Sequence, residues 1–284
     1  MSLQNICLKN EFLTVKINTL GAEMTSIQTP DGEEKLHQPD MVFWNGRAPV
    51  LFPICGTPIG DKITVDGKEY SMNEHGFAKD SEFNLMECSD DLAVFSLVSN
   101  DETKKVYPYD FELLITYKLL GKAIDVSYEV INDSKETMYF SIGSHEGYNC
   151  MSGLKNYILE FETPEAAIPY TDGDPDLGIP EGEIKTIELS DELFAGSRSV
   201  IFKNPTSNAL WVKNKDGSEK IRVEYEGFDY LVIWTQPNTQ FICIEPWCGM
   251  GEFYEFPKDI SVKEGIQAIE EGCQFERHHI ITID

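Results

Sequence analysis

Apolar and polar residues alternate along most of the chain, and this period of two constrains the fold more than any other feature. The longest alternating segments are residues 111–120 and 124–130, and only a short connection around Gly121-Lys122 separates them. Two such segments joined by a short turn predict an antiparallel hairpin of long strands. A chain dominated by this pattern favours sheets over helices.

A second hairpin is predicted where Asp66-Gly67, a dipeptide typical of tight turns, joins residues 62–65 to residues 68–71. Further strands are expected at residues 13–17, 92–98, 138–142, 157–161, 209–213, 221–225, 231–235, 241–245 and 275–283. No long stretch has the apolar period of a helix. Many strands with Gly, Asn and Asp at the turns predict an all-β fold, either a sandwich or a barrel.

No linker, internal repeat or change of composition divides the chain, so we expect one domain over residues 1–284. Residues 163–192 are rich in Pro, Gly, Asp and Glu and are expected to form a long loop. Such a loop is either a solvated acidic surface or a lid over one face. Residues 249–259 are expected to be a second connector.

Composition excludes several classes of function. The 49 acidic and 23 basic residues give a formal charge of −26, which repels a phosphate backbone, so no nucleic-acid partner is expected. The sequence has no apolar run long enough to cross a membrane and no signal-like N-terminus, so we expect a cytoplasmic protein. Only four arginines are present, which does not favour a phosphosugar site. The seven cysteines are scattered without a CxxC pair, so we expect buried, reduced thiols and no metal.

Three residues are candidates for acid–base chemistry near neutral pH. His75 lies in a polar turn directly before Gly76, a residue type that allows a ligand to approach the backbone. His145 follows an apolar strand and has glycines close on both sides. Glu245 ends the apolar run 241–244, where a carboxylate is costly unless it is paired or used. Each residue taken alone also fits a structural role, such as a loop histidine or a strand-end ion pair.

Aromatic residues lie near these polar candidates, namely Trp44, Phe77, Tyr148, Trp234 and Trp247. Sugar rings pack their apolar C–H faces on aromatic rings while their hydroxyls need hydrogen bonds, so this mixture is typical of a carbohydrate site. Each aromatic residue on its own equally fits the core. Arg47 either donates paired hydrogen bonds to sugar hydroxyls or pairs with a surface acid.

The order of these segments resembles the aldose 1-epimerase, or galactose mutarotase-like, family and in particular its shorter bacterial branch. The resembling segments are residues 44–56, 67–80 with the motif HGFAKD, 140–149, 232–247 and 272–283. The resemblance implies a large antiparallel β-supersandwich with a sugar site on its concave face, formed as a single domain over residues 1–284. It also implies an isomerase without cofactor or metal that interconverts the α and β anomers of a free aldohexose.

By the family pattern, Glu245 is expected to remove the C1 hydroxyl proton, His145 to deliver a proton to the ring oxygen and His75 to polarise the same region. Ring opening does need one proton removed and one supplied at neighbouring oxygens. The expected sugar-binding residues are Trp44, Arg47, Phe77, Asp80, Tyr148, Asn149, Trp234 and Trp247. The expected partner is a small-molecule sugar, and the choice between a monomer and a homodimer stays open.

Three positions differ from the family pattern. Thr57 stands where many members have an arginine, no aspartate occurs in the stretch around Ser197, and Lys79 replaces another arginine. These positions belong to the sugar-binding half of the site, whereas all three proton-transfer residues are present. Two alternatives therefore stay open, a sugar-binding or regulatory protein with little turnover and a hexose-6-phosphate epimerase.

Overall fold

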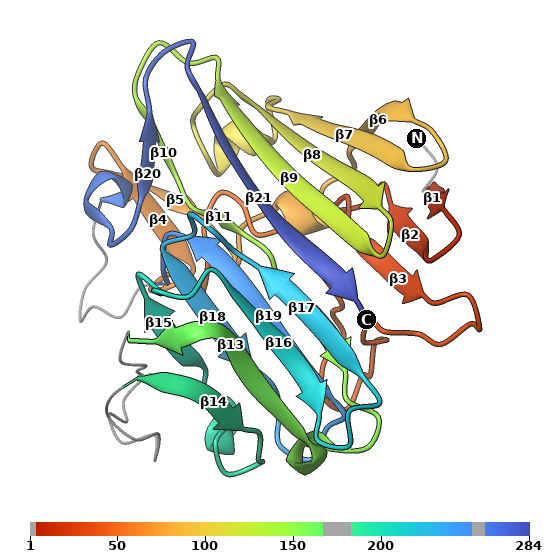
Figure 1. Cartoon of the computed structure of the whole chain (residues 1–284). Coiled ribbons are helices and arrows are strands. Elements are labelled where there is room, and N and C mark those ends of the chain that lie inside the picture. Colours follow the sequence, from red (N-terminus) through yellow and green to blue (C-terminus); the bar gives the residue numbers. More distant parts are fainter. Residues whose placement is uncertain (1–3, 167–182, 252–258) are drawn as a thin grey trace.

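The computed structural model describes residues 4–166, 183–251 and 259–284, and most of its regular elements are antiparallel strands (Figure 1). The largest sheet has nine strands in the order β14-β13-β16-β17-β21-β9-β8-β7-β6. Their bounds are β6 Asn84–Cys88, β7 Leu92–Val98, β8 Phe111–Leu120, β9 Ala123–Asn132, β13 Tyr157–Glu165, β14 Ile184–Glu188, β16 Ala209–Asn214, β17 Lys220–Glu224 and β21 Gln274–Ile283.

A second sheet of five strands has the order β11-β19-β18-β15, with β12 also paired to β19. Its bounds are β11 Ile142–Gly143, β12 Glu146–Asn149, β15 Val200–Lys203, β18 Tyr230–Trp234 and β19 Phe241–Cys248. The smaller sheets contain β1 Asn5–Lys9, β2 Thr14–Asn18 and β3 Met24–Gln28; β4 Lys62–Val65 and β5 Lys68–Ser71; and β10 Met138–Phe140 and β20 Gln267–Ile269. Single 3₁₀ turns are η1 Ala78–Asp80, η2 Thr103–Lys105, η3 Leu154–Asn156, η4 Ala195–Ser197 and η5 Ile260–Val262.

Both predicted hairpins are confirmed. Strands β8 and β9 pair over their whole length, and alternate residues of both strands are buried. Strands β4 and β5 pair around Asp66 and Gly67, whose φ angles of 51° and 74° are those that a tight hairpin turn requires. The predicted all-β architecture is therefore confirmed.

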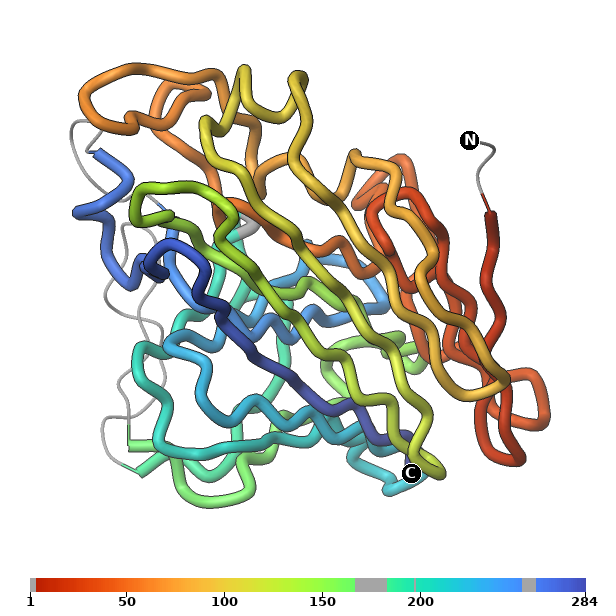
Figure 2. The backbone as a smooth tube through the Cα atoms, turned by 90° about the horizontal axis from the view of Figure 1, so that it is seen from above, coloured from red at the N-terminus to blue at the C-terminus, as the bar shows by residue number. Residues whose placement is uncertain are grey.

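The main core lies between the nine-stranded and five-stranded sheets. Ile242 and Ile244 of β19 belong to the same buried apolar cluster as Val126 of β9 and Ile281 of β21. The first strands of the chain lie beside the β6–β7 edge of the large sheet, where β1 contacts β7 (Figure 2). Because one face of the five-stranded sheet packs on the main core, its opposite face is left free of this core.

Several predicted boundaries are wrong. The loop expected at residues 163–192 is shorter, because β13 continues to Glu165 and β14 occupies Ile184–Glu188. Residues 167–182 of this loop lie outside the described part of the chain. So do residues 252–258 of the second expected connector. Residues 138–142 do not form one strand, since Ser141 leaves β10 to donate its backbone N–H to Pro53. Strand β19 does not end at Glu245 but continues to Cys248.

Three cysteines expected to be buried, Cys7, Cys88 and Cys273, are exposed.

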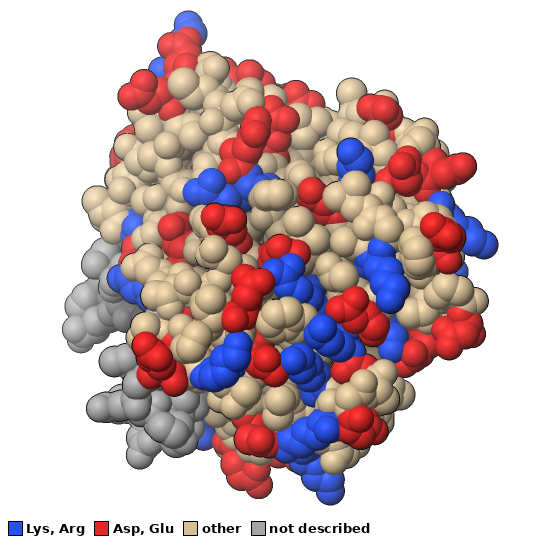
Figure 3. All heavy atoms as spheres, in the orientation of Figure 1, with Lys and Arg blue, Asp and Glu red and all other residues tan. Residues whose placement is uncertain are grey.

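Charged side chains of both signs are interspersed over the outer face of the large sheet (Figure 3). Lys213 pairs with Glu160 at 2.6 Å and Arg222 pairs with Glu162 at 2.6 Å on this face. Such partly exposed pairs keep a sheet face solvated and contribute little stability each. Among the described residues, no helix is both long and apolar enough to span a membrane.

Candidate active site

The candidate site lies on the face of the five-stranded sheet that points away from the main core. Side chains alternate along β19, so that Ile242 and Ile244 enter the core while Cys243, Glu245 and Trp247 face the other way. Strand β18 alternates in the same manner, and Val232 lies directly opposite Glu245 in the register. The period of two therefore places a carboxylate and a tryptophan side by side on one wall.

A cavity of about 1040 Å³ opens on this wall. All three residues predicted to move protons line it, His75, His145 and Glu245. They come from a loop before η1, from the short connection between β11 and β12, and from β19. The fold thus brings together residues that lie 70 and 100 positions apart in the sequence.

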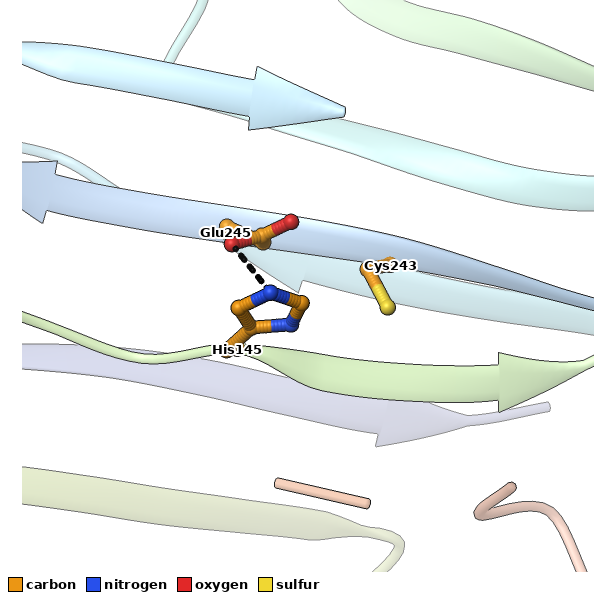
Figure 4. Close-up of side chains that lie close together, drawn as sticks. All are labelled: His145, Cys243 and Glu245. Carbon is orange, nitrogen blue, oxygen red and sulfur yellow. Dashed lines mark ion pairs between the residues drawn. The ribbon is translucent and has the colours of Figure 1, made fainter. Parts of the chain in front are cut away.

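The histidine and the glutamate form a direct pair. Nε2 of His145 lies 3.2 Å from Oε2 of Glu245, and the side chain of Glu245 is only 1% exposed (Figure 4). Burial raises the pKa of Glu245 well above its usual value, and the charges of Glu146 and Glu74 raise it further. Burial also holds the pKa of His145 well below its usual value, with the neighbouring His75 acting in the same direction. Both shifts favour a pair without charge that holds one proton in total.

Aromatic rings pack around the imidazole of His145. The ring of Trp44 stacks on it with centroids 4.9 Å apart, and Trp234 meets it edge-on at 5.6 Å. The His75 ring lies perpendicular to it at 5.3 Å. This packing explains why burial dominates the shift in the pKa of His145.

Glycines on both sides of His145 allow this packing. A Cβ atom at Gly143 would lie 2.6 Å from the ring of Trp247, and one at Gly147 would lie 2.9 Å from the ring of Trp44. Neither distance is tolerated by a real side chain, so both positions need glycine for close approach rather than for a special backbone angle. The indole of Trp247 also donates a hydrogen bond to the carbonyl of Ser144 at 3.1 Å, which fixes the connection that carries His145.

The loop geometry of His75 defines which nitrogen faces the cavity. The backbone N–H of Gly56 donates to Nδ1 of His75 at 3.1 Å. Nδ1 is thus an acceptor, and the proton of the neutral imidazole must be on Nε2. Burial lowers the pKa of His75 to about 4, so this neutral form is the one present near pH 7. His75 is therefore a hydrogen-bond donor, not a cation, at neutral pH.

Four predicted sugar-binding residues line the cavity, namely Trp44, Asp80, Trp234 and Trp247. The other four do not, and the structure gives each a different environment. Arg47 lies beside the cavity wall, with its guanidinium 3.9 Å from the carboxylate of Glu23. Phe77 packs edge-on against Phe52 of the core, with ring centroids 6.2 Å apart.

Tyr148 and Asn149 were expected to bind the sugar, but the geometry of β12 places both side chains away from the cavity. Tyr148 lies three residues after His145 on an alternating strand, so its side chain faces the core, where it is fully buried. The side-chain amide of Asn149 donates to the carbonyls of Glu34 and Leu36 and holds that segment of chain against β12. Neither residue lines the cavity.

The cavity contains polar residues that the sequence did not indicate. Glu23 lines it, accepts a hydrogen bond from the backbone N–H of Ala48 at 3.2 Å and is 23% exposed in its side chain. Burial raises the pKa of Glu23, with Ala48 and Arg47 opposing the shift. Other polar residues on the wall are Asn45, Thr57, Glu74, Ser199 and Gln236. Glu23 follows a turn with no recognisable motif, so only the three-dimensional fold could identify it.

Cys243 lies next to the pair, and its sulfur and the donor atoms of His145 and Glu245 are all within 4.8 Å of one another (Figure 4). Thiol, imidazole and carboxylate are also the ligand types of zinc sites. Burial raises the pKa of the Cys243 thiol well above its usual value, which disfavours the thiolate that binds a metal. Cys243 is therefore better described as a protonated thiol than as a metal ligand. The absence of a metal stays a prediction.

Comparisons with known proteins agree with this architecture. A family model described as aldose 1-epimerase matches residues 4–265. The LacX protein from a plasmid of Lactococcus lactis subsp. lactis is 34% identical over 268 residues, which cover 87% of this chain and 89% of that protein. The family resemblance expected from the sequence is therefore confirmed.

Solved structures share the whole fold. A galactose mutarotase related enzyme from Lactobacillus acidophilus has a TM-score of 0.90 at 28% identity and covers 99% of this chain and 97% of its own. A galactose mutarotase-like protein from Lactobacillus casei ATCC 334 has a TM-score of 0.91 at 28% identity and covers 99% of this chain and 100% of its own. The predicted galactose mutarotase-like supersandwich is confirmed by these neighbours.

Proposed function

Because the chain belongs to the aldose 1-epimerase family, we propose that it interconverts the α and β anomers of a free aldohexose by acid–base opening and closing of the sugar ring. The observation that carries this proposal is the pair of His145 and Glu245, 3.2 Å apart and set in an aromatic cavity. Two proton-transfer groups at this separation match a substrate whose reacting oxygens share one carbon.

The reaction uses one proton held by the pair. Glu245 takes the proton of the C1 hydroxyl while His145 gives a proton to the ring oxygen, and the bond between C1 and that oxygen breaks. The C1–C2 bond of the open-chain aldehyde then rotates, and the reverse transfers close the ring on the other face. For this step the proton must be on His145, whereas burial favours it on Glu245 in the free protein. Sugar hydroxyls bound in the cavity supply the hydrogen bonds that bring the two arrangements closer in free energy.

His75 complements the pair as a neutral donor. Its Nε2–H, fixed by the hydrogen bond from Gly56 to Nδ1, is available to the ring oxygen or to the C1 oxygen. Trp44, Trp234 and Trp247 provide apolar surface for the faces of a pyranose ring. In this proposal Glu23 accepts a sugar hydroxyl, which replaces part of the binding lost with the missing arginine and aspartate.

The charges around the cavity favour a neutral sugar over a hexose 6-phosphate. Glu23, Glu74 and Asp80 line the cavity around the pair, whereas the one lysine in its described wall, Lys79, pairs with Asp80 at 2.6 Å. A phosphate dianion would be repelled by these carboxylates. The acidic wall therefore supports the free-sugar assignment.

A sugar-binding protein with little turnover is the second candidate. Thr57 donates its hydroxyl to Glu74 at 2.6 Å and offers no guanidinium, and Arg47 is outside the cavity lining. Magnetisation-exchange NMR at equilibrium separates the candidates, because it measures anomer exchange directly for glucose, galactose and glucose 6-phosphate. We expect faster exchange for a free hexose than for its phosphate. Binding of a hexose without faster exchange would support the second candidate instead.

The remaining expectations stay predictions, namely one domain over residues 1–284, a cytoplasmic location and the choice between monomer and homodimer.

A further inference from the structure

A second carboxylate lies directly behind the candidate catalytic pair, on the other face of the same sheet. Glu146 follows His145 in the chain and pairs with Ile244 in the register of β12 and β19. Directly paired residues share a face, so Glu146 points into the core together with Ile244, while His145 and Glu245 point into the cavity. Glu146 is 3% exposed.

This carboxylate has a buried partner in the opposing sheet. Nε2 of His279 on β21 lies 3.2 Å from Oε1 of Glu146, and the two side chains are 0% and 4% exposed. The hydroxyl of Tyr128 on β9 lies 3.4 Å from Nδ1 of His279, with the two rings stacked at 5.8 Å. Oε2 of Glu146 and the hydroxyl of Tyr148 have no hydrogen-bond partner among the described residues. The core thus contains a polar chain that runs from the large sheet to the back of the site.

A buried acid–histidine pair is hard to explain by stability alone. Apolar residues of similar volume in the place of a buried ion pair are often as stabilising or more so. Unpaired polar atoms beside it add a further cost. The position suggests another role, because a charge in a core of low dielectric acts on groups across the thickness of one sheet.

We propose that Glu146, held by His279, is a positioning residue whose charge sets the field in which Glu245 takes up and releases its proton. The proposal rests on the proposed function, and it adds a part of the molecule that does not touch the sugar. After burial, the charge of Glu146 is the largest cause that raises the pKa of Glu245. A negative charge behind the pair keeps the shared proton bound at higher pH.

Other ionisable groups surround both carboxylates and must be kept constant. Those around Glu245 are Cys243 of β19, His145 before β12, Glu74 and His75 of the loop before η1, Cys55, and Glu146 across the sheet. Those that face Glu146 in the core are Tyr117 of β8, Tyr128 of β9, Tyr148 of β12 and His279 of β21, and Cys243 of β19 lies across the sheet from it. Substitution of Glu146 alone leaves all of them in place.

The experiment compares Glu146→Gln, Glu146→Asp and Glu165→Gln with the unmodified protein. Glu146→Gln removes the charge, and Glu146→Asp keeps it. Glu165 is a matched control, because it is also buried but is bound by Thr206 and Ser207, and none of these three residues lines the cavity. Infrared difference spectra recorded across a pH titration follow the buried carboxyl band of Glu245, which Glu245→Gln identifies. The sugar reaction is followed over the same pH range.

In Glu146→Gln we expect the titration midpoint of Glu245 to fall by about one pH unit. A shift of this size is typical when a neighbouring negative charge, partly screened by the protein, is removed. The alkaline limit of the sugar reaction moves with it, while KM stays unchanged. Glu146→Asp and Glu165→Gln keep the original midpoint. An unchanged midpoint in Glu146→Gln, or an equal shift in Glu165→Gln, overturns the proposal. If no variant and no unmodified protein turns over sugar, the proposed function fails, yet the infrared titration still decides this inference.

Discussion

Nε2 of His145 lies 3.2 Å from Oε2 of Glu245, and their side chains are only 10% and 1% exposed. Burial shifts their pKa values in opposite directions, up for the acid and down for the base. The two residues therefore act as one unit that exchanges protons in two macroscopic steps. A group with this property suits a reaction that moves one proton off a substrate and another on.

The first prediction concerns pH. The pair is productive while it holds one proton, so activity falls in acid when a second proton binds and falls in base when the last proton leaves. Because the pKa of His145 is lowered and that of Glu245 is raised, we expect a plateau that extends below pH 6.5 on the acid side. Initial rates of anomer exchange between pH 4 and pH 10 measure this. An acid limit at the ordinary histidine value of about 6.5 would contradict the assigned environment.

The second prediction concerns Glu23. Glu23→Gln removes the charge of a carboxylate that lines the cavity and is held by Ala48, and we expect KM for a hexose to rise roughly tenfold with little change in kcat. A matched control is Glu219→Gln, a partly buried carboxylate that binds Lys35 away from the cavity. Equal KM and kcat values for both variants would show that Glu23 does not bind the sugar.

The third prediction concerns Gly147. A methyl group there would lie 2.9 Å from Trp44 and 3.0 Å from His37, so Gly147→Ala must displace the ring that stacks on His145. We expect a loss of about 1–3 kcal/mol in the free energy of unfolding and weaker sugar binding. Gly32→Ala is the control, since its site has no neighbour within 4 Å and only backbone strain is added. Unchanged sugar binding in Gly147→Ala would show that the Trp44 contact has no role.

The fourth prediction concerns stability in acid. The pKa of His75 is about 4 in the folded protein and about 6.5 in an unfolded chain. The folded state thus binds fewer protons between these values, and the stability that neutral His75 contributes is present above pH 6.5 and is lost as the pH falls to about 4. In His75→Asn, urea unfolding should show a shallower loss of stability over this range. His278→Asn is the control, because His278 is exposed. If stability depended on pH equally in the unmodified protein, His75→Asn and His278→Asn, the lowered pKa of His75 would be refuted.

Much of the fold and part of the site follow from the sequence. The long hairpin of β8 and β9 was predictable because period-two burial is read directly from alternating residues. Strand β12 was not predicted, because all but its last residue are buried and it has no alternation of polarity. That omission also explains the wrong assignment of Tyr148, since a known strand would have placed it on the face opposite His145.

The binding half of the site was harder to predict than its acid–base half. His75, His145 and Glu245 sit in distinctive local settings, whereas Glu23 has none and reaches the cavity through tertiary packing. Arg47 shows the reverse problem, because a residue type suited to sugar hydroxyls is held instead beside Glu23 at the edge of the wall. Substrate contacts depend on which side chains converge, and sequence spacing does not contain that information.

The roles proposed for His145 and Glu245 are tested by polarimetry of freshly dissolved α-galactose and α-glucose with the unmodified protein, Glu245→Gln and His145→Asn. We expect that the unmodified protein accelerates the change in optical rotation and that each variant loses about 10²- to 10⁴-fold of this acceleration. Melting curves confirm that the variants are folded. No acceleration of either sugar by the unmodified protein, or full activity in both variants, would contradict the central claim that His145 and Glu245 open the sugar ring.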